Sequence, residues 1–120
     1  MKRLKCHCGA IEAEIKAPES LEKIIRCNCS LCKRKGAVMS LVKNEDFKII
    51  KGASKIKLYQ FHTKVARHYF CSICGIYTHH NPRSNPKMTG FNIACIDDID
   101  TFNLEEVLIN DGHNHPLDKN

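Results

Sequence analysis

Short alternations of apolar and polar residues recur along the 120-residue chain and are separated by turn-forming residues. The clearest lies at residues 9–18, where apolar residues alternate with glutamates and Pro18 follows. Successive side chains of a strand point to opposite faces. The pattern therefore predicts a half-buried strand with Ile11, Ala13 and Ile15 on its inner face.

Other alternating or apolar segments predict further short strands at residues 21–27, 37–42, 47–52, 55–61, 67–71, 75–80, 90–96 and 105–111. The segment GFNIACI (90–96) is expected to be one continuous buried strand. The segment SLCKRKG (30–36) predicts one helical turn, with Ser30 as its N-cap and Gly36 as its end. No segment carries a helical period over about ten residues. The sequence thus predicts a mainly β fold of antiparallel sheets, in one domain over residues 1–120.

Composition narrows the class of protein and its surroundings. Hydrophobic residues make up 42% of the chain and charged residues 27%, which is typical of a folded globular domain. No run approaches the roughly 18 apolar residues that cross a membrane, and MKRLKCHCG at the start lacks the apolar stretch of a signal peptide. We therefore expect a cytoplasmic protein without a membrane partner. Because thiols stay reduced there, the eight cysteines are expected to bind metal rather than form disulfides.

Seven of the eight cysteines fall into three groups, which are Cys6 and Cys8, then Cys27, Cys29 and Cys32, then Cys71 and Cys74. The eighth, Cys95, lies in an apolar run and is expected in the core. Structural zinc takes four ligands in a tetrahedron, and the two outer groups together supply four thiolates. Gly9 and Gly75 follow these groups and permit the tight turns that such a site needs. The alternative partition joins the middle group to one outer cysteine and leaves three others unused.

The middle group, Cys27, Cys29 and Cys32, then offers three thiolates from one loop. Three protein ligands and an open fourth position are the arrangement of catalytic zinc. A fourth protein ligand could instead close the site, and the candidates are Cys95, His7, His68, His113 and His115. A redox cluster without a permanent metal is a third possibility.

The net charge bears on the class of partner. The formal charge is +6, and seven thiolates with two Zn²⁺ ions would reduce it to about +3. This is a mildly basic surface, and aromatic residues are few. Nucleic acid is therefore an unlikely partner.

At this point the motifs resemble those of a known family. The segments CHCGAI, CNCSLCKRKG, YFCSICG, FNIACID and DGHNHP occur here in the order seen in the glutathione-dependent formaldehyde-activating enzyme family, which includes centromere protein V-type domains. The resemblance runs from Cys6 to Pro116. The tail differs from the commoner form of the family, which ends in Trp where this chain has the pair His115 and Pro116.

The resemblance implies a β-tent fold, in which two packed antiparallel sheets are joined by zinc. It implies two Zn²⁺ ions per chain: a structural ion on Cys6, Cys8, Cys71 and Cys74 and a functional ion on Cys27, Cys29 and Cys32. It also implies a carbon–sulfur lyase that reversibly joins a small thiol such as glutathione to formaldehyde, forming S-hydroxymethylglutathione. The sequence does not specify an oligomeric state.

Several residues near these motifs are candidates for the chemistry. His113 and His115 are candidate acid–base groups because histidine titrates near neutral pH, and His115 is the catalytic candidate. His79 and His80, as strand neighbours, would face opposite sides, so at most one can face a given pocket. The basic run Lys33, Arg34 and Lys35 could hold substrate carboxylates or simply form a solvated turn, and His62 and His68 are expected to be surface or structural residues.

Two other functions compete with the lyase hypothesis. The first is a non-catalytic zinc module that binds protein or nucleic acid, and the second is a thiol redox or metal-handling protein. A zinc readily removed by chelator favours an enzyme or a sensor, whereas two equally resistant ions favour a structural module.

Overall fold

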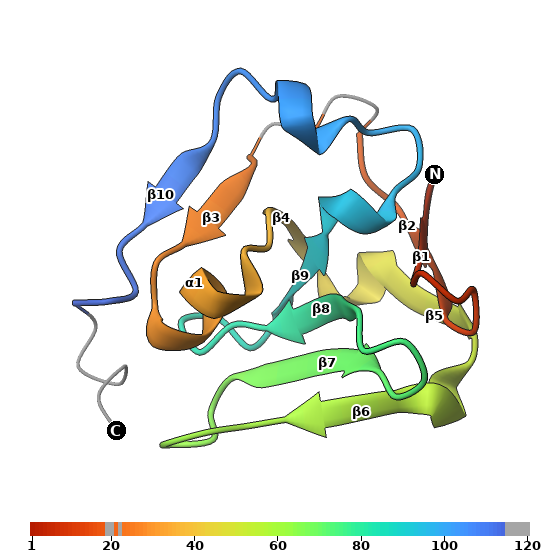
Figure 1. Ribbon diagram of the computed structural model, residues 1–120, viewed down its shortest axis with the longest axis horizontal. Coiled ribbons are helices and arrows are strands. Elements are labelled where there is room, and N and C mark those ends of the chain that lie inside the picture. The colour runs from red at the N-terminus through yellow and green to blue at the C-terminus, as the bar shows by residue number, and fades with distance from the viewer. Residues whose placement is uncertain (19–20, 22, 115–120) are drawn as a thin grey trace.

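Two β-sheets form the framework of the computed structural model, which describes residues 1–18, 21 and 23–114 (Figure 1). The strands are β1 Lys2–Lys5, β2 Glu12–Ile15, β3 Ile25–Cys27, β4 Met39–Lys43, β5 Phe47–Lys51, β6 Ile56–Tyr59, β7 Arg67–Cys71, β8 Tyr77–Asn81, β9 Met88–Asn92 and β10 Leu108–Asn110. The helical elements are α1 Ser30–Lys35 and the 3₁₀ turns η1 Asn44–Asp46, η2 Ala53–Lys55, η3 Ile93–Cys95 and η4 Thr101–Asn103. The predicted mainly β fold is confirmed.

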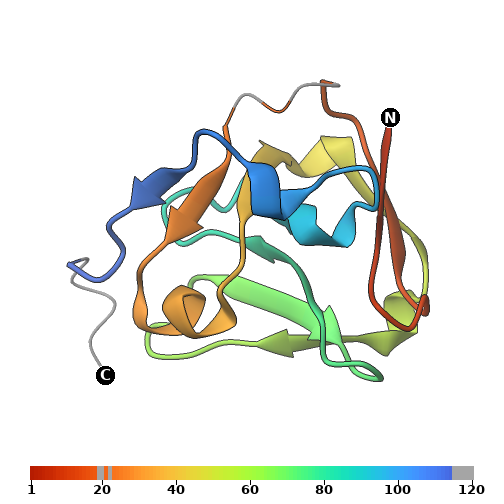
Figure 2. The ribbon, with the colours of Figure 1, turned by 45° about the horizontal axis from the view of Figure 1, so that its top comes forward.

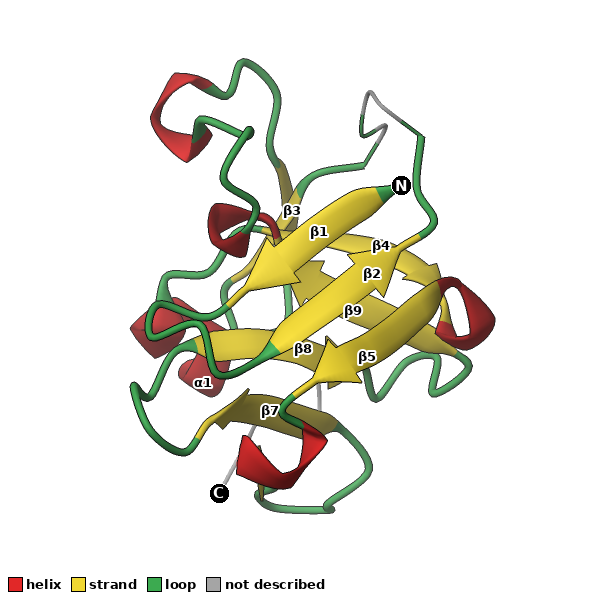
Figure 3. Cartoon of the chain, turned by 90° about the vertical axis from the view of Figure 1, so that its right-hand side faces the viewer, coloured by secondary structure: helices red, strands yellow, loops and turns green. Residues whose placement is uncertain are grey.

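The smaller sheet has the order β1-β2-β5 and is antiparallel throughout. Its central strand carries the alternation seen in the sequence, and Ile11, Ala13 and Ile15 are fully buried as predicted. Figure 3 shows this sheet lying across strands of the second sheet. The alternation thus gives the sheet one apolar face, and that face packs inward.

The larger sheet has the order β10-β3-β4-β9-β8-β7-β6. Its neighbouring strands pair antiparallel, with one exception that corrects the prediction: β10 pairs parallel to β3, with Leu108 opposite Ile25. The chain returns over the top of the molecule after β9 to reach this edge (Figure 1). This places the segment that follows β10 beside the cysteines that follow β3.

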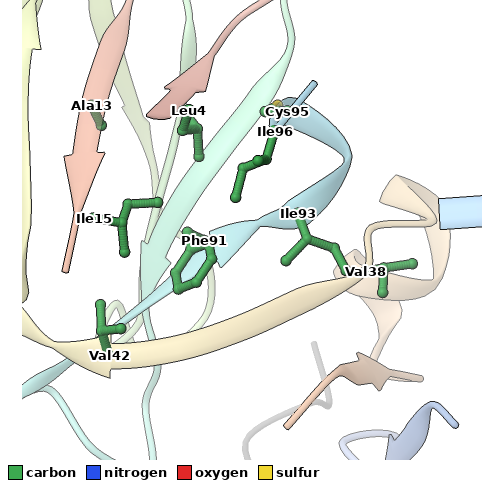
Figure 4. Close-up of a cluster of buried hydrophobic side chains, with 9 residues drawn as sticks. All are labelled: Leu4, Ala13, Ile15, Val38, Val42, Phe91, Ile93, Cys95 and Ile96. Atoms are coloured by element: carbon green, nitrogen blue, oxygen red, sulfur yellow. The ribbon is translucent and has the colours of Figure 1, made fainter. Parts of the chain in front are cut away.

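The main core fills the space between the two sheets (Figure 4). Leu4, Ala13 and Ile15 of the smaller sheet face Phe91 and Val42 of the larger one. Phe91 is fully buried, and truncation of a buried phenylalanine costs about 3–5 kcal/mol. Aliphatic packing around this ring therefore holds the two sheets together.

The segment 90–96 differs from the predicted continuous strand. The strand β9 ends at Asn92, whose side-chain Oδ1 accepts a hydrogen bond from the Ala94 N–H at 3.2 Å and begins the 3₁₀ turn η3. Cys95 remains 8% exposed within the core, as predicted. The side-chain bond at Asn92 competes with the strand ladder and ends it.

The helix α1 lies beside β3 and β8, away from the smaller sheet (Figures 1 and 2). It ends at Gly36, which adopts φ +63° as expected of a helix stop. Its N-cap is Cys29 rather than the predicted Ser30, because the Cys29 sulfur accepts the Cys32 N–H at 3.3 Å. None of the helices among the described residues has the length and apolar character to span a membrane.

Candidate metal centres and the adjoining cleft

The outer cysteine groups meet in space, as the spacing predicted. The sulfurs of Cys6, Cys8, Cys71 and Cys74 all lie within 4.8 Å of one another. Cys6 and Cys8 are 3.6 Å apart and Cys8 and Cys71 are 3.7 Å apart, measured between sulfurs. Four sulfurs at about 2.3 Å from a tetrahedral zinc would lie about 3.8 Å from one another. The four residues thus fit a zinc ion.

Two similar turns present these sulfurs. In the first, the Cys6 N–H bonds to the Ile11 carbonyl and Gly9 has φ +79°. In the second, the Cys71 N–H bonds to the Ile76 carbonyl and Gly75 has φ +78°. Each turn also aims backbone donors at its first sulfur, which are the N–H of Ile11 at 3.3 Å from Cys6 and the N–H groups of Ile73 and Cys74 at 3.4 and 3.5 Å from Cys71. These donors would stabilise thiolates.

Cys8 and Cys74 differ in proton affinity. The Ala10 N–H lowers the pKa of Cys8, but desolvation and the bonds to the other three cysteines outweigh it and raise that pKa to about 11. Desolvation raises the pKa of Cys74, but the backbone N–H groups of Cys8 and Ile76 outweigh it and lower that pKa to about 6.

The middle group forms a second cluster at the other end of the large sheet. The sulfurs of Cys27, Cys29 and Cys32 lie within 4.8 Å of one another, at the end of β3 and the start of α1. No histidine or further cysteine from the described residues joins them. Of the candidate fourth ligands, Cys95 instead lies near the other cluster, where the Cys6 and Cys74 charges help raise its pKa to about 12 after desolvation. His7, His68 and His113 are also not in the group.

The segment after β10 packs directly against this three-cysteine cluster. Asn110 donates from Nδ2 to the Cys27 sulfur at 3.6 Å, and the His113 N–H donates to Asn28 Oδ1 at 2.9 Å. A Cβ on Gly112 would lie 2.6 Å from the Cys27 sulfur and 2.8 Å from Cys29 Cβ. The residues from Asn110 to His113 thus form part of the wall of the cluster. His115 lies outside the described residues.

Hydrogen bonding gives Cys27 and Cys32 opposite pKa shifts. Hydrogen bonds with Cys29 and Cys32 hold the pKa of Cys27 far below its ordinary value. Hydrogen bonds with Cys27 and Cys29, together with burial, hold the pKa of Cys32 far above its ordinary value. A metal ion would convert all three residues to thiolates, which fits a soft, thiol-preferring ion such as zinc.

A cleft of about 520 Å³ lies between α1 and the large sheet. Its walls include Leu31 and Lys35 from the helix and Phe70 and Tyr77 from β7 and β8. Lys35 places Nζ 3.4 Å from the centre of the Tyr77 ring, whereas Lys33 and Arg34 are exposed. Burial lowers the pKa of Lys35 to about 8, although the Cys32 and Cys29 thiolates oppose the shift. The basic run is therefore divided into two solvated residues and one that faces the cleft.

The two histidines of β8 face opposite sides of the sheet, as predicted. His79 stacks on Tyr69 at 4.5 Å and meets Phe47 in a tilted contact at 4.7 Å, measured between ring centres. His80 stacks on His68 at 5.5 Å. Burial lowers the pKa of His68 to about 3 and of His80 to about 4, so both are neutral near pH 7. Tyr77 lies with His68 and His80, at 6.2 and 6.1 Å, and burial raises its pKa well above 10.

Sequence reasoning overlooked Tyr77 because regular alternation along β8 would put its side chain on the same face as His79, away from His80. The pairing of β7 with β8 shifts between Tyr69 and Phe70, which leaves Thr78 as an extra residue in β8. A bulge of this kind re-aims the flanking side chains. The signal that could have identified Tyr77 is its position three residues after Cys74, in the strand that leaves the second cysteine turn.

Comparison with known proteins agrees with this geometry. The model of the family described as GFA, glutathione-dependent formaldehyde-activating enzyme, matches residues 1–109. The chain belongs to the GFA family. A structural-genomics crystal structure of a Rhodobacter sphaeroides protein is 41% identical, with a TM-score of 0.85, over 90% of this chain and 99% of that one. The β-tent fold of this family is therefore confirmed.

The GFA match includes all seven clustered cysteines and stops before the DGHNHP segment. Both cysteine clusters of the chain thus lie in the region that the family model covers. The family is associated with formaldehyde-activating chemistry linked to glutathione. The two cysteine clusters of this chain are compatible with zinc.

Proposed function

We propose that the protein is a zinc-dependent carbon–sulfur lyase acting on the adduct of a small thiol and an aldehyde, such as S-hydroxymethylglutathione. One observation carries the proposal: three thiols converge from one loop beside a cleft, and no fourth ligand joins them from the described residues. Membership of the GFA family, which is associated with formaldehyde-activating activity, supports this reaction class. The other cluster, with four thiols, would hold a structural ion.

A zinc ion on Cys27, Cys29 and Cys32 would favour the thiolate form of a thiol substrate in the remaining position. The protein's own residues would bind and orient the rest of that substrate. Lys33 and Arg34 are exposed beside Cys32 and could pair with the carboxylates of glutathione. Lys35 projects its charge over Tyr77 at the cleft wall. His115 remains a proposed acid–base group.

The test is exchange spectroscopy by NMR on a mixture of glutathione and formaldehyde, with metal-loaded protein. We expect exchange between free and adduct glutathione above the spontaneous rate. Cys29→Ser should abolish the acceleration, whereas Cys95→Ala, which removes a thiol outside both clusters, should retain it. Absence of acceleration by the metal-loaded wild type would contradict the formaldehyde reaction.

A further inference from the structure

Three buried polar atoms on the α1 side of the large sheet have no hydrogen-bond partner among the described residues. They are His68 Nδ1, Tyr77 Oη and His80 Nδ1. Folded proteins pair nearly all of their buried polar groups, and an unpaired group is destabilising. The three rings form one set, with centres 5.5 to 6.2 Å apart. A cluster of unpaired atoms in one place indicates a polar ligand that completes it.

Two features of the backbone create this cluster. The extra residue Thr78 turns Tyr77 onto the face of His80. On the neighbouring strand Gly90 lies opposite His80, and a Cβ there would come within 2.2 Å of the His80 ring. Only glycine leaves room for the ring in this position. The arrangement therefore depends on specific residues in three adjacent strands.

The cluster adjoins both the cleft and the three cysteines. Tyr77 lines the cleft, and Lys35 covers its ring. The charges of Lys35 and of the Cys29 thiolate both act on His68 and on His80. The unpaired atoms thus belong to a group that reaches the cleft through Tyr77 and lies within the electrostatic influence of Cys29.

We propose that Tyr77, His68 and His80 bind the oxygen of the aldehyde-derived carbon, which is a carbonyl oxygen before the C–S bond forms and a hydroxyl afterwards. This inference rests on the proposed function and names the part of the substrate that these residues recognise. A neutral histidine offers one donor and one acceptor, and a tyrosine hydroxyl offers both. The set can therefore bind a carbonyl oxygen and a hydroxyl equally.

The chemistry balances as follows. The thiol releases one proton to solvent when it ionises, and its sulfur then forms the C–S bond while the C=O π pair moves onto the oxygen. That oxygen takes a proton delivered through Tyr77 Oη, and solvent returns a proton to Tyr77. The net change is addition of one thiol to one aldehyde, and each transfer runs backwards in cleavage.

The experiment uses metal-loaded protein carrying ¹⁵N-labelled histidine. Glutathione alone is titrated first, and glutathione with formaldehyde second, so that the two ligands differ by the added CH₂OH group. The His68 and His80 ring nitrogens should shift only with the second ligand. The variant Tyr77→Phe keeps the ring under Lys35 and removes the unpaired oxygen. It should weaken adduct binding about tenfold, as expected for one lost hydrogen bond, and leave glutathione binding within about twofold.

The matched control is Tyr69→Phe, which removes the tyrosine hydroxyl on the opposite face of the same strand pair. It should bind both ligands as wild type does. Equal adduct affinity in wild type and Tyr77→Phe, unmoved ring nitrogens, or no adduct binding at all would each overturn the inference. Failure of the proposed function would give a different result. Wild type would bind the adduct more tightly than Tyr77→Phe does, but it would not accelerate exchange between free and adduct glutathione.

Discussion

The two cysteine clusters differ in how the fold builds them. The four-cysteine cluster joins two turns that are 65 residues apart between Cys6 and Cys71, and each turn repeats the same backbone bonds and left-handed glycine. The three-cysteine cluster comes from one loop and is walled by the segment after β10. A metal ion on the four-cysteine cluster would close a long loop of chain, whereas an ion on the three-cysteine cluster would close only a short one.

This difference bears on the roles proposed for the two clusters. Tying distant segments removes much conformational freedom from the unfolded chain, so an ion on the four-cysteine cluster would contribute to folding. An ion on the three-cysteine cluster would fix a short loop and leave a position for a substrate. The sequence separation of the cysteines in each cluster thus supports the structural role proposed for one cluster and the functional role proposed for the other.

The sharpest test of the comparison is a pair of single substitutions. Cys74→Ser should lower the free energy of unfolding by at least about 5 kcal/mol, since structural zinc sites bind with about 10–16 kcal/mol. Cys29→Ser should lower it by less than about 2 kcal/mol, because serine is itself a good helix N-cap. Urea unfolding and metal content measure both, and each variant should lose one ion. Similar destabilisation by the two substitutions would contradict the division of roles.

Acid releases metal from cysteine sites, so the pH at which each cluster loses its ion is another way to compare them. The stability of the fold itself also depends on pH, and that dependence must be known first. Burial lowers the pKa of His79 to about 4 from 6.5. Between these values the unfolded chain takes up a proton that the folded protein excludes. The His79 contribution is therefore complete above pH 6.5 and lost as pH falls through 4, a change of about 3 kcal/mol.

The variant His79→Gln should remove this dependence. Its free energy of unfolding, subtracted from that of wild type at each pH from 7 to 4, isolates the His79 proton, because both proteins share the thiols and the other histidines. A flat difference across this range would mean that His79 is not held neutral by burial. The remaining acid dependence of the variant can then be assigned to the cysteine clusters and other groups.

The part of the fold that follows from local pattern could be read from the sequence. The alternation of apolar and polar residues predicted the burial of Ile11, Ala13 and Ile15. The spacing of the two outer cysteine pairs, each followed by a glycine, predicted that they lie together. The extra residue Thr78 could not be read in this way, because a bulge is a property of the pairing and not of one strand. The Tyr77 cluster was missed for that reason.

The parallel pairing of β10 with β3 could not be predicted either. Leu108 and Ile109 are 56% and 65% exposed, so their apolar character does not report a buried face, and an edge strand can join either end of a sheet. The position of Gly112 against Cys27 follows from this pairing. One end of the candidate site thus depends on a long-range contact that leaves little trace in the local sequence.

Gly112→Ala tests that contact at the three-cysteine cluster. The added Cβ would lie 2.6 Å from the Cys27 sulfur, so the tail or the loop must move. Forcing a methyl group into a packed position typically costs about 1–3 kcal/mol. We expect weaker metal binding at this cluster, measured by competition with a chelator, and unchanged retention of the ion at the four-cysteine cluster. Loss of both ions together would show that the effect is on the whole fold.

Gly75→Ala is the matched change at the four-cysteine cluster and has the smallest expected effect. No atom lies within 4 Å of the added Cβ, so the only penalty is the left-handed backbone at φ +78°, which costs an alanine about 1 kcal/mol. The substitution should lower the free energy of unfolding by that amount without releasing the ion. The comparison would be reversed if Gly75→Ala lowered the free energy of unfolding more than Gly112→Ala does. The backbone turn, and not the space around the sulfurs, would then be the more restrictive part of a cysteine site.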